Sequence, residues 1–313
     1  MRSNRLSEEG AMSRRIETVL IGTSLSEASD DVVRAGVDLA RAAGAKVSLV
    51  HAFLPQVAYG GGAPFVTEVM VDEVVRAERI TLRRNMDEQV TRLGLRPEEL
   101  AGTVLEDGPP HRVLIETCHK VGADLIVLGA AESPRLAKVF GSTAERVVRK
   151  ATRPVLVVRG RMAMPPKRVL LPVDLSPLSA DAFRHGLAVL GQLDPGHRAV
   201  LEAYFVMTEL DRQAYAPKAA PEMGESNAGR SLETFVTRNA YGTGWAVEPK
   251  VGTGFVDEEI LARMEDWNPD LIVLGTHGRG GFERFLLGSV AASVVRNAGT
   301  SVLVVPPEAA LKE

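Results

Sequence analysis

The stretch from Gly275 to Ser289 holds the residue types that most directly suggest chemistry. It is rich in glycine, and it ends in a Gly-Ser pair that opens a segment of helical periodicity. Glycine has no Cβ, so its backbone N–H can approach an anion closely. The first N–H groups of a helix are unpaired, and the helix dipole favours negative charge there. The stretch predicts a phosphate-binding loop that includes these residues: Gly275, Thr276, His277, Gly278, Arg279, Arg284, Gly288 and Ser289.

The same residues allow a simpler interpretation, in which a glycine-rich loop without a ligand precedes an ordinary helix whose N-cap is Ser289. Magnitudes also limit what the loop does by itself. Electrostatic attraction at a helix terminus contributes about 0.3–1 kcal/mol, or ~2 when partly buried. Micromolar affinity requires roughly −8 kcal/mol. A phosphate loop therefore needs a second wall that holds the rest of the ligand.

Pro172-Val173-Asp174 is the candidate for that wall, because it ends an apolar run that precedes a helical segment. A carboxylate there is suited to accept hydrogen bonds from an amino group or a ribose hydroxyl. The alternative is that Asp174 only orders the turn before a helix capped by Ser176, with Pro177 at the favoured first position. The residues leave both interpretations open.

The chain repeats itself, which indicates how these residues are positioned. The sequence ADLIVLG at 123–129 returns as PDLIVLG at 269–275, and each copy is followed by a loop and a Gly-Ser pair. Short apolar runs alternate with amphipathic helical stretches, a pattern typical of parallel α/β sheets. We therefore predict two doubly wound modules with five strands each. The strands are expected at 18–23, 46–53, 101–106, 124–129 and 155–159, and at 168–173, 198–206, 246–252, 270–275 and 302–305.

The predicted organisation has five parts: an N-terminal arm at 1–15, module 1 at 16–160, a linker at 161–167, module 2 at 168–306 and a tail at 307–313. The formal net charge of −3 argues against a nucleic-acid-binding surface. No apolar run is long enough to span a membrane. The single cysteine, Cys118, suits a reducing compartment, so we expect a cytoplasmic protein without a metal site.

Gly275-x2-Gly278-x9-Gly288-Ser289, together with Asp174-x-Ser176 after a first strand, resembles the pattern of ATP-binding universal stress proteins. The resemblance covers both repeats and implies parallel sheets of strand order 3-2-1-4-5. It implies ATP, with or without Mg²⁺, across the ends of the first and fourth strands of module 2. Adenine would lie by Asp174 and near Ala203, and Val290 would join the phosphate-binding residues. It also implies that the last strands, Val155–Val158 and Val302–Val304, pair between modules, and we expect a homodimer that associates through them.

Module 1 departs from this pattern at two positions. Ser24 stands where module 2 has Asp174, and Glu132 stands where it has Gly278. A glutamate there brings bulk and negative charge to the place of a triphosphate. We therefore predict that module 1 does not bind ATP.

The leading expectation is a nucleotide-dependent regulatory protein of the stress response. One alternative is a slow ATPase or a nucleotidyl-transfer enzyme, although no general base is recognisable beside the loop. Another is a nucleotide-free interaction protein with a different small ligand in module 1. A dinucleotide site is not expected, because the loop lacks the G-x-G-x-x-G spacing and follows a late strand.

Overall fold

The computed structural model describes residues 15–55, 68–130, 143–215, 223–278 and 287–307. The strands of the first half are β1 (Thr18–Gly22), β2 (Lys46–Phe53), β3 (Leu100–Asp107), β4 (Leu125–Gly129) and β5 (Val155–Val158). Those of the second half are β6 (Arg168–Val173), β7 (Val200–Met207), β8 (Val247–Thr253), β9 (Leu271–Gly275) and β10 (Ser301–Val305). Each predicted strand is present, with its ends shifted by no more than about two residues, the usual uncertainty of such boundaries.

Helices alternate with these strands along the chain. In the first half they are α1 (Asp30–Ala43), α2 (Glu68–Arg92), α3 (Pro110–Val121) and α5 (Thr143–Lys150). In the second half they are α6 (Pro177–Leu193), α7 (Glu209–Tyr215), α8 (Gly224–Ala240), α9 (Val256–Trp267) and α10 (Ser289–Asn297).

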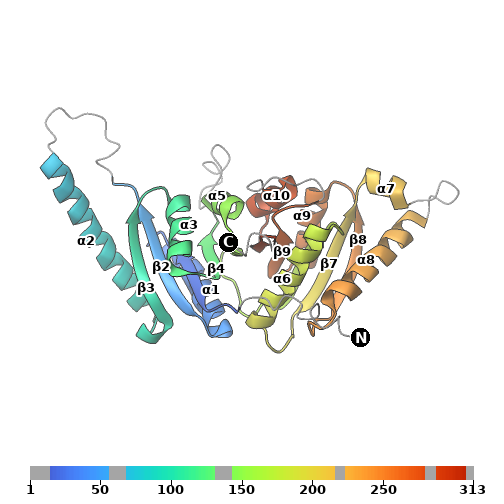
Figure 1. Ribbon diagram of the computed structural model, residues 1–313, viewed down its shortest axis with the longest axis horizontal. Coiled ribbons are helices and arrows are strands. Elements are labelled where there is room, and N and C mark those ends of the chain that lie inside the picture. The colour runs from blue at the N-terminus through green and yellow to red at the C-terminus, as the bar shows by residue number, and fades with distance from the viewer. Residues whose placement is uncertain (1–14, 56–67, 131–142, 216–222, 279–286, 308–313) are drawn as a thin grey trace, which may run out of the picture.

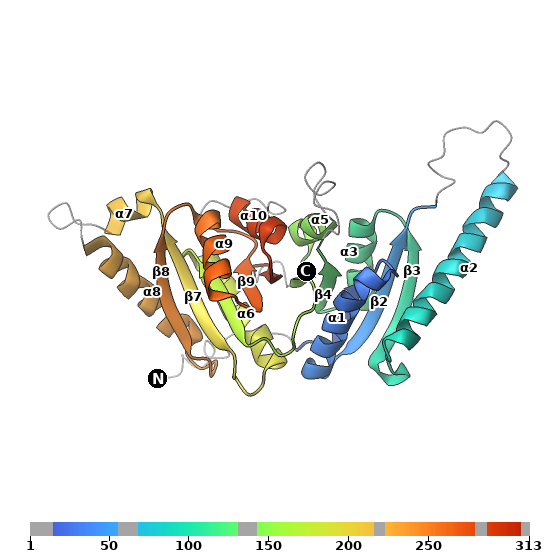
Figure 2. The ribbon, with the colours of Figure 1, turned by 180° about the vertical axis from the view of Figure 1, so that it is seen from behind.

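All ten strands belong to one sheet, in the order β3-β2-β1-β4-β5-β10-β9-β6-β7-β8. Neighbours within each half are parallel. Each half therefore has the predicted order 3-2-1-4-5, and the doubly wound α/β fold in two modules is confirmed. The two arrays meet at their fifth strands, and the halves lie side by side with their helices splayed outward (Figures 1 and 2).

Helices cover both faces of this sheet because strand side chains alternate between its faces. One core cluster joins alternate strand residues to α1, α2, α6 and α8, through side chains such as Met86, Leu187 and Leu232. The other joins the remaining strand residues to α3, α5, α9 and α10, through Leu114 and Val294 among others. Burial on both faces explains the continuous apolar runs of β4 and β9.

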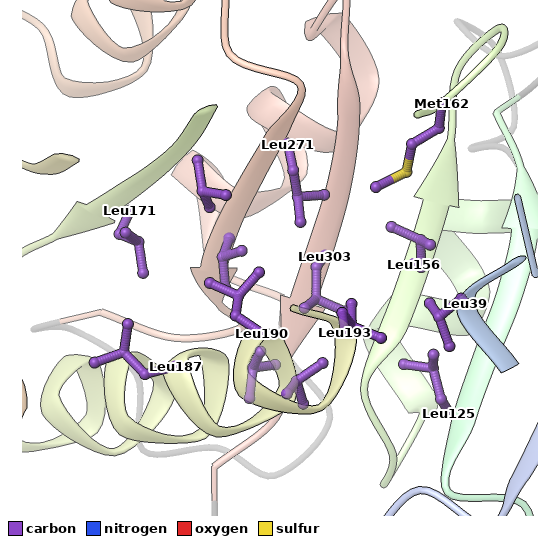
Figure 3. Close-up of a cluster of buried hydrophobic side chains, with 14 of the residues drawn as sticks. Leu39, Leu125, Leu156, Met162, Leu171, Leu187, Leu190, Leu193, Leu271 and Leu303 are labelled. Carbon is purple, nitrogen blue, oxygen red and sulfur yellow. The ribbon is translucent and has the colours of Figure 1, made fainter. Parts of the chain in front are cut away.

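The joint between the modules is an antiparallel pairing of β5 with β10, in which Leu156 lies opposite Leu303. Leucines from α6 and from both halves of the sheet fill the core beneath it, with Leu193 beside Leu303 (Figure 3). The predicted pairing of the last strands is therefore confirmed within one chain. A homodimer formed through these strands is a wrong expectation, because each already has a neighbour on both edges.

Candidate functional site

The end of the first strand in module 2 is a tightly bonded turn. Asp174 accepts a hydrogen bond through Oδ1 from the N–H of Ser176 at 2.9 Å, and its own N–H donates to Ser179 Oγ at 3.1 Å. Ser176 caps α6 by accepting from the N–H of Ser179 at 3.1 Å, and Pro177 follows at the first helical position. The turn also holds Leu175 in the left-handed region, with φ of 64°. Asp174 thus orders this turn, as the simpler interpretation expects, with one of its two oxygens.

The other oxygen of Asp174 faces the glycine loop. A Cβ placed on Gly278 would lie 2.6 Å from Asp174 Oδ2, closer than real Cβ contacts come. Two residues 104 positions apart in the sequence are therefore neighbours across the carboxyl ends of β6 and β9. The edge of the sheet where they meet is where open α/β folds bind their ligands.

The glycine loop closes on itself where it leaves and rejoins regular structure. Gly288 donates its N–H to the carbonyl of Thr276 at 2.8 Å, and Thr276 in turn donates to the carbonyl of Val305 at 3.2 Å. A Cβ on Gly275 would meet the Cβ of Ala182 at 2.8 Å, which would push α6 away from β9. Glycine at 275 is thus required by the close approach of α6, whereas a larger residue at 278 would displace the carboxylate of Asp174.

Helix α10 begins directly after this closure, and among the described residues no side chain caps its first turn. Its N-cap is Gly288, with no side-chain hydrogen bond, and Ser289 is already the first helical residue. The interpretation in which Ser289 is an ordinary N-cap is therefore wrong. The N–H groups of this turn lack the acceptor that Ser176 provides in α6, and the positive end of the helix dipole adds to their field.

The remaining predicted residues fall in three groups. Pro172 and Val173 form the last two positions of β6, beneath Asp174, and Val290 packs partly buried against the core under α10. His277 shares a hydrogen bond between its Nδ1 and Thr276 Oγ1, 2.8 Å apart, and its buried Nε2 has no partner among the described residues. Arg279 and Arg284 lie outside the described residues.

Ala203 does not lie at the end of β7, where it was expected to contact the adenine. It lies in the middle of β7, pairs with Leu171 and is fully buried in the core. The residue of β7 level with Val173 is Phe205, two residues beyond Ala203, whereas the strand itself ends at Met207, one residue beyond the predicted bound. Apolar periodicity locates a strand but does not show which of its residues lies level with the end of the neighbouring strand, so the sequence misplaced this contact.

Module 1 holds a cavity of about 690 Å³ at the corresponding edge of its sheet. The ends of β1, β2, β4 and β5 line it, with Ser24, His51 and Arg159 among its polar residues. Ser24 shares a hydrogen bond with Ser26, and the Nδ1–H of His51 donates to the carbonyl of Thr23 at 2.8 Å. Leu25 repeats the left-handed turn of Leu175, with φ of 63°, so the two modules share this turn without sharing the carboxylate. Glu132 lies outside the described residues.

Arg159 is a residue that the sequence did not single out. It follows β5, and its Nη2 donates to the carbonyls of Val295 at 2.7 Å and Arg296 at 2.8 Å, at the end of α10. Burial lowers the pKa of its guanidinium, and its Nε is buried without a partner among the described residues. A contact between modules leaves no local pattern in the sequence, so Arg159 had no signal there.

Other chemistry is sparse in the described ranges. Burial raises the pKa of the Cys118 thiol to about 11, which keeps it protonated and unreactive near neutral pH. Within those ranges, His, Cys, Asp and Glu side chains do not gather in groups of three or more that would hold a metal ion. The helices described there include none with the length and apolar character needed to cross a membrane.

Comparison with known proteins agrees with this geometry. The model of the universal stress protein family matches residues 15–159 and again 165–306. The chain belongs to the universal stress protein family. A universal stress protein of Mycolicibacterium smegmatis is 28% identical over 304 residues, which cover 92% of this chain and 97% of the relative.

Further relatives cover one module or show the fold. A universal stress protein of Methanocaldococcus jannaschii is 30% identical over 142 residues, which cover 44% of this chain and 81% of that protein. The crystal structure of a universal stress protein from Archaeoglobus fulgidus has a TM-score of 0.63 at 20% identity, over 93% of this chain and 96% of that one. The tandem arrangement of two family modules is therefore shared with proteins of similar length.

Proposed function

We propose that this universal stress protein binds ATP in its second module and acts as a nucleotide-dependent regulatory protein of the stress response. The observation that supports it most is the proximity of Asp174 Oδ2 to Gly278, because it joins a base- or ribose-binding carboxylate to a phosphate loop. The uncapped first turn of α10 supplies N–H donors beside that loop.

The residues fit the nucleotide chemically. Gly278 leaves the space that a Cβ would fill, and Gly288, Ser289 and Val290 begin the helix whose N-terminus would face the phosphates. Asp174 and the end of β7 would hold the adenosine. When bound with the nucleotide, Mg²⁺ would neutralise phosphate charge, for which Arg279 and Arg284 are further candidates. The proposal includes a cytoplasmic location, in keeping with the single cysteine.

Isothermal titration with ATP tests the proposal on matched glycine variants. Gly278→Ala places a methyl group 2.6 Å from Asp174 Oδ2, so we expect at least a tenfold loss of ATP affinity. Gly229→Ala is the control, because nothing lies within 4 Å of the added Cβ, and it should bind as the wild type does. Absence of binding heat in the wild type, or equal affinity in both variants, would contradict the proposal.

Hydrolysis of the bound ATP is tested by measuring phosphate release. A general base requires a side chain within hydrogen-bond reach of the attacking water. Of the described residues beside Gly278, Asp174 is assigned in this proposal to the adenosine and His277 shares its Nδ1 with Thr276, so neither is given that role. We therefore expect phosphate release to stay close to the uncatalysed rate. Sustained release that disappears in Ser289→Ala would favour the alternative, an ATPase or a nucleotidyl-transfer enzyme.

The cavity in module 1 favours a second candidate function, the binding of a small ligand other than ATP. Its volume of about 690 Å³ lies within the range of small-molecule sites, and Arg159 and His51 are among its lining residues. Native mass spectrometry of the purified protein would show an adduct that is displaced neither by ATP nor by Gly278→Ala. Loss of the adduct in both cases would place the ligand in module 2 instead.

A further inference from the structure

A groove of about 470 Å³ lies between α6 and α8 in module 2, and Ser176, two residues after Asp174, is among its lining residues. Its base is apolar, with Ala180 and Phe235, and its walls carry Arg184 and Arg238. The hydroxyl groups of Ser231 and Thr234 also line it. The corresponding place in module 1 lies between α1 and α2, and the group that occupies it there indicates which ligand would suit the groove.

In module 1 that place is filled by a buried carboxylate. Asp30, only 5% exposed, accepts hydrogen bonds from Arg92 Nε and Nη2, each at 2.9 Å. Gln89, fully buried, donates to Asp30 at 2.8 Å and links it to Ser29 and Thr23. The guanidinium thus binds a carboxylate through two parallel bonds, the strongest arrangement for this pair.

Module 2 keeps the arginine and lacks the carboxylate. The sequence Val90-Thr91-Arg92 returns as Val236-Thr237-Arg238, so Arg238 takes the helix position of Arg92. On the facing helix the ion pair of Asp31 with Arg34 returns as that of Asp181 with Arg184, which places Ala180 at the position of Asp30. By the same alignment Phe235 replaces Gln89.

The charge of the groove is therefore positive. Arg184 is engaged by Asp181 and by Asn239 Oδ1 at 2.6 Å, and these contacts neutralise Asp181. Arg238, which is exposed, has no hydrogen-bond or ion-pair partner among the described residues. One free guanidinium above an apolar base is suited to an anion of single charge that carries an apolar body, rather than to a polyphosphate.

We propose that this groove binds a small monocarboxylate, whose carboxylate takes the place at Arg238 that Asp30 occupies at Arg92. The hydroxyl groups of Ser231 and Thr234 add donors, and a ring or short chain lies on Phe235 and Ala180. The site does not depend on ATP and would persist if the proposed nucleotide site were wrong.

Benzoate is the probe, with benzamide as its uncharged counterpart, and binding is followed by NMR titration of the full chain. We expect benzoate to saturate in the millimolar range and to shift amide signals of α6 and α8, with benzamide at least tenfold weaker. Arg238→Ala should weaken benzoate at least tenfold. The control Arg230→Ala, on the same helix outside the groove, should leave it unchanged.

Ala180→Asp restores the internal carboxylate of module 1 and supplies a second, independent readout. It should raise the melting temperature by pairing with Arg238 and weaken benzoate at least tenfold, whereas Ala180→Asn should not raise the melting temperature. The proposal is overturned if benzoate binds Arg238→Ala or Ala180→Asp as it binds the wild type, if benzamide binds equally well, or if no saturation is reached.

Discussion

Single residues distinguish the two modules while the turns around them stay the same. Leu25 and Leu175 take the same left-handed conformation, yet the residue before each is Ser24 in one module and Asp174 in the other. Asp30 and Ala180 differ in the same way on the first helix. The backbone is thus conserved between the repeats, and side-chain chemistry is divided between them.

The buried Asp30 makes the first prediction. Hydrogen bonds from Arg92 are the main cause that lowers the pKa of Asp30 in the folded chain. Asp30→Asn should therefore lower the free energy of unfolding at pH 7 by about 1–3 kcal/mol, since bonds to a charged group are lost. A folded pKa below the unfolded value of about 3.9 means that this stabilisation is present above that pH and lost as the pH falls through the folded pKa.

Urea denaturation between pH 3 and pH 7 measures this difference. Asp31→Asn is the matched control, because its pair with Arg34 is half-exposed and is expected to contribute less than about 1 kcal/mol. A penalty in Asp30→Asn that stays constant down to pH 3, or one no larger than that of Asp31→Asn, would show that the ion pair is not its source.

At the scale of elements, both ends of α10 make hydrogen bonds with residues from other parts of the chain. Gly288 closes the glycine loop at its start, and Arg159 from module 1 binds the carbonyls at its end. Arg296 of the same helix pairs with the buried Glu145 of α5 at 3.1 Å. The helix that begins at the proposed phosphate site is therefore fixed to the other module.

Arg159→Ala should lower the free energy of unfolding by about 1.5–3 kcal/mol, because a charged group that donates to two carbonyls at the end of α10 is removed. Arg161→Ala, at an exposed position two residues further on, should change it by less than about 0.5 kcal/mol. Chemical denaturation of both variants measures the contrast. Equal stability of the two would mean that Arg159 does not hold the end of α10.

The elements themselves were largely predictable from the sequence, because apolar periodicity and internal repetition are local signals. The bounds of β2 and β6 match the prediction, and Ser176 caps α6 as expected. The misplaced contact at Ala203 and the overlooked Arg159 have a common cause. Both depend on which residues meet across strands or modules, and that information is absent from any single stretch of the chain.

At the scale of the whole molecule, the chain forms its own pseudo-dimer. The fifth strands pair across the joint, and the core beneath them is continuous from α1 to α6. Self-association with a second chain stays a prediction and requires another surface, since β5 and β10 are internal strands.

A continuous core predicts that both modules unfold together. The two tryptophans, Trp245 and Trp267, lie in module 2, so their fluorescence follows that half, whereas far-ultraviolet circular dichroism follows the whole chain. The two transitions should coincide. Leu303→Ala removes most of a buried side chain at the joint. It should lower the free energy of unfolding by about 2–5 kcal/mol, and by the same amount in both measurements. Separate transitions in the wild type would show that the joint does not couple the modules.

The number of ATP molecules bound per chain tests the central claim most directly. Isothermal titration should give one site per chain, and Gly278→Glu, which places the module 1 residue in module 2, should abolish it. Two sites per chain, or a single site that survives Gly278→Glu, would contradict the assignment of nucleotide binding to the second module.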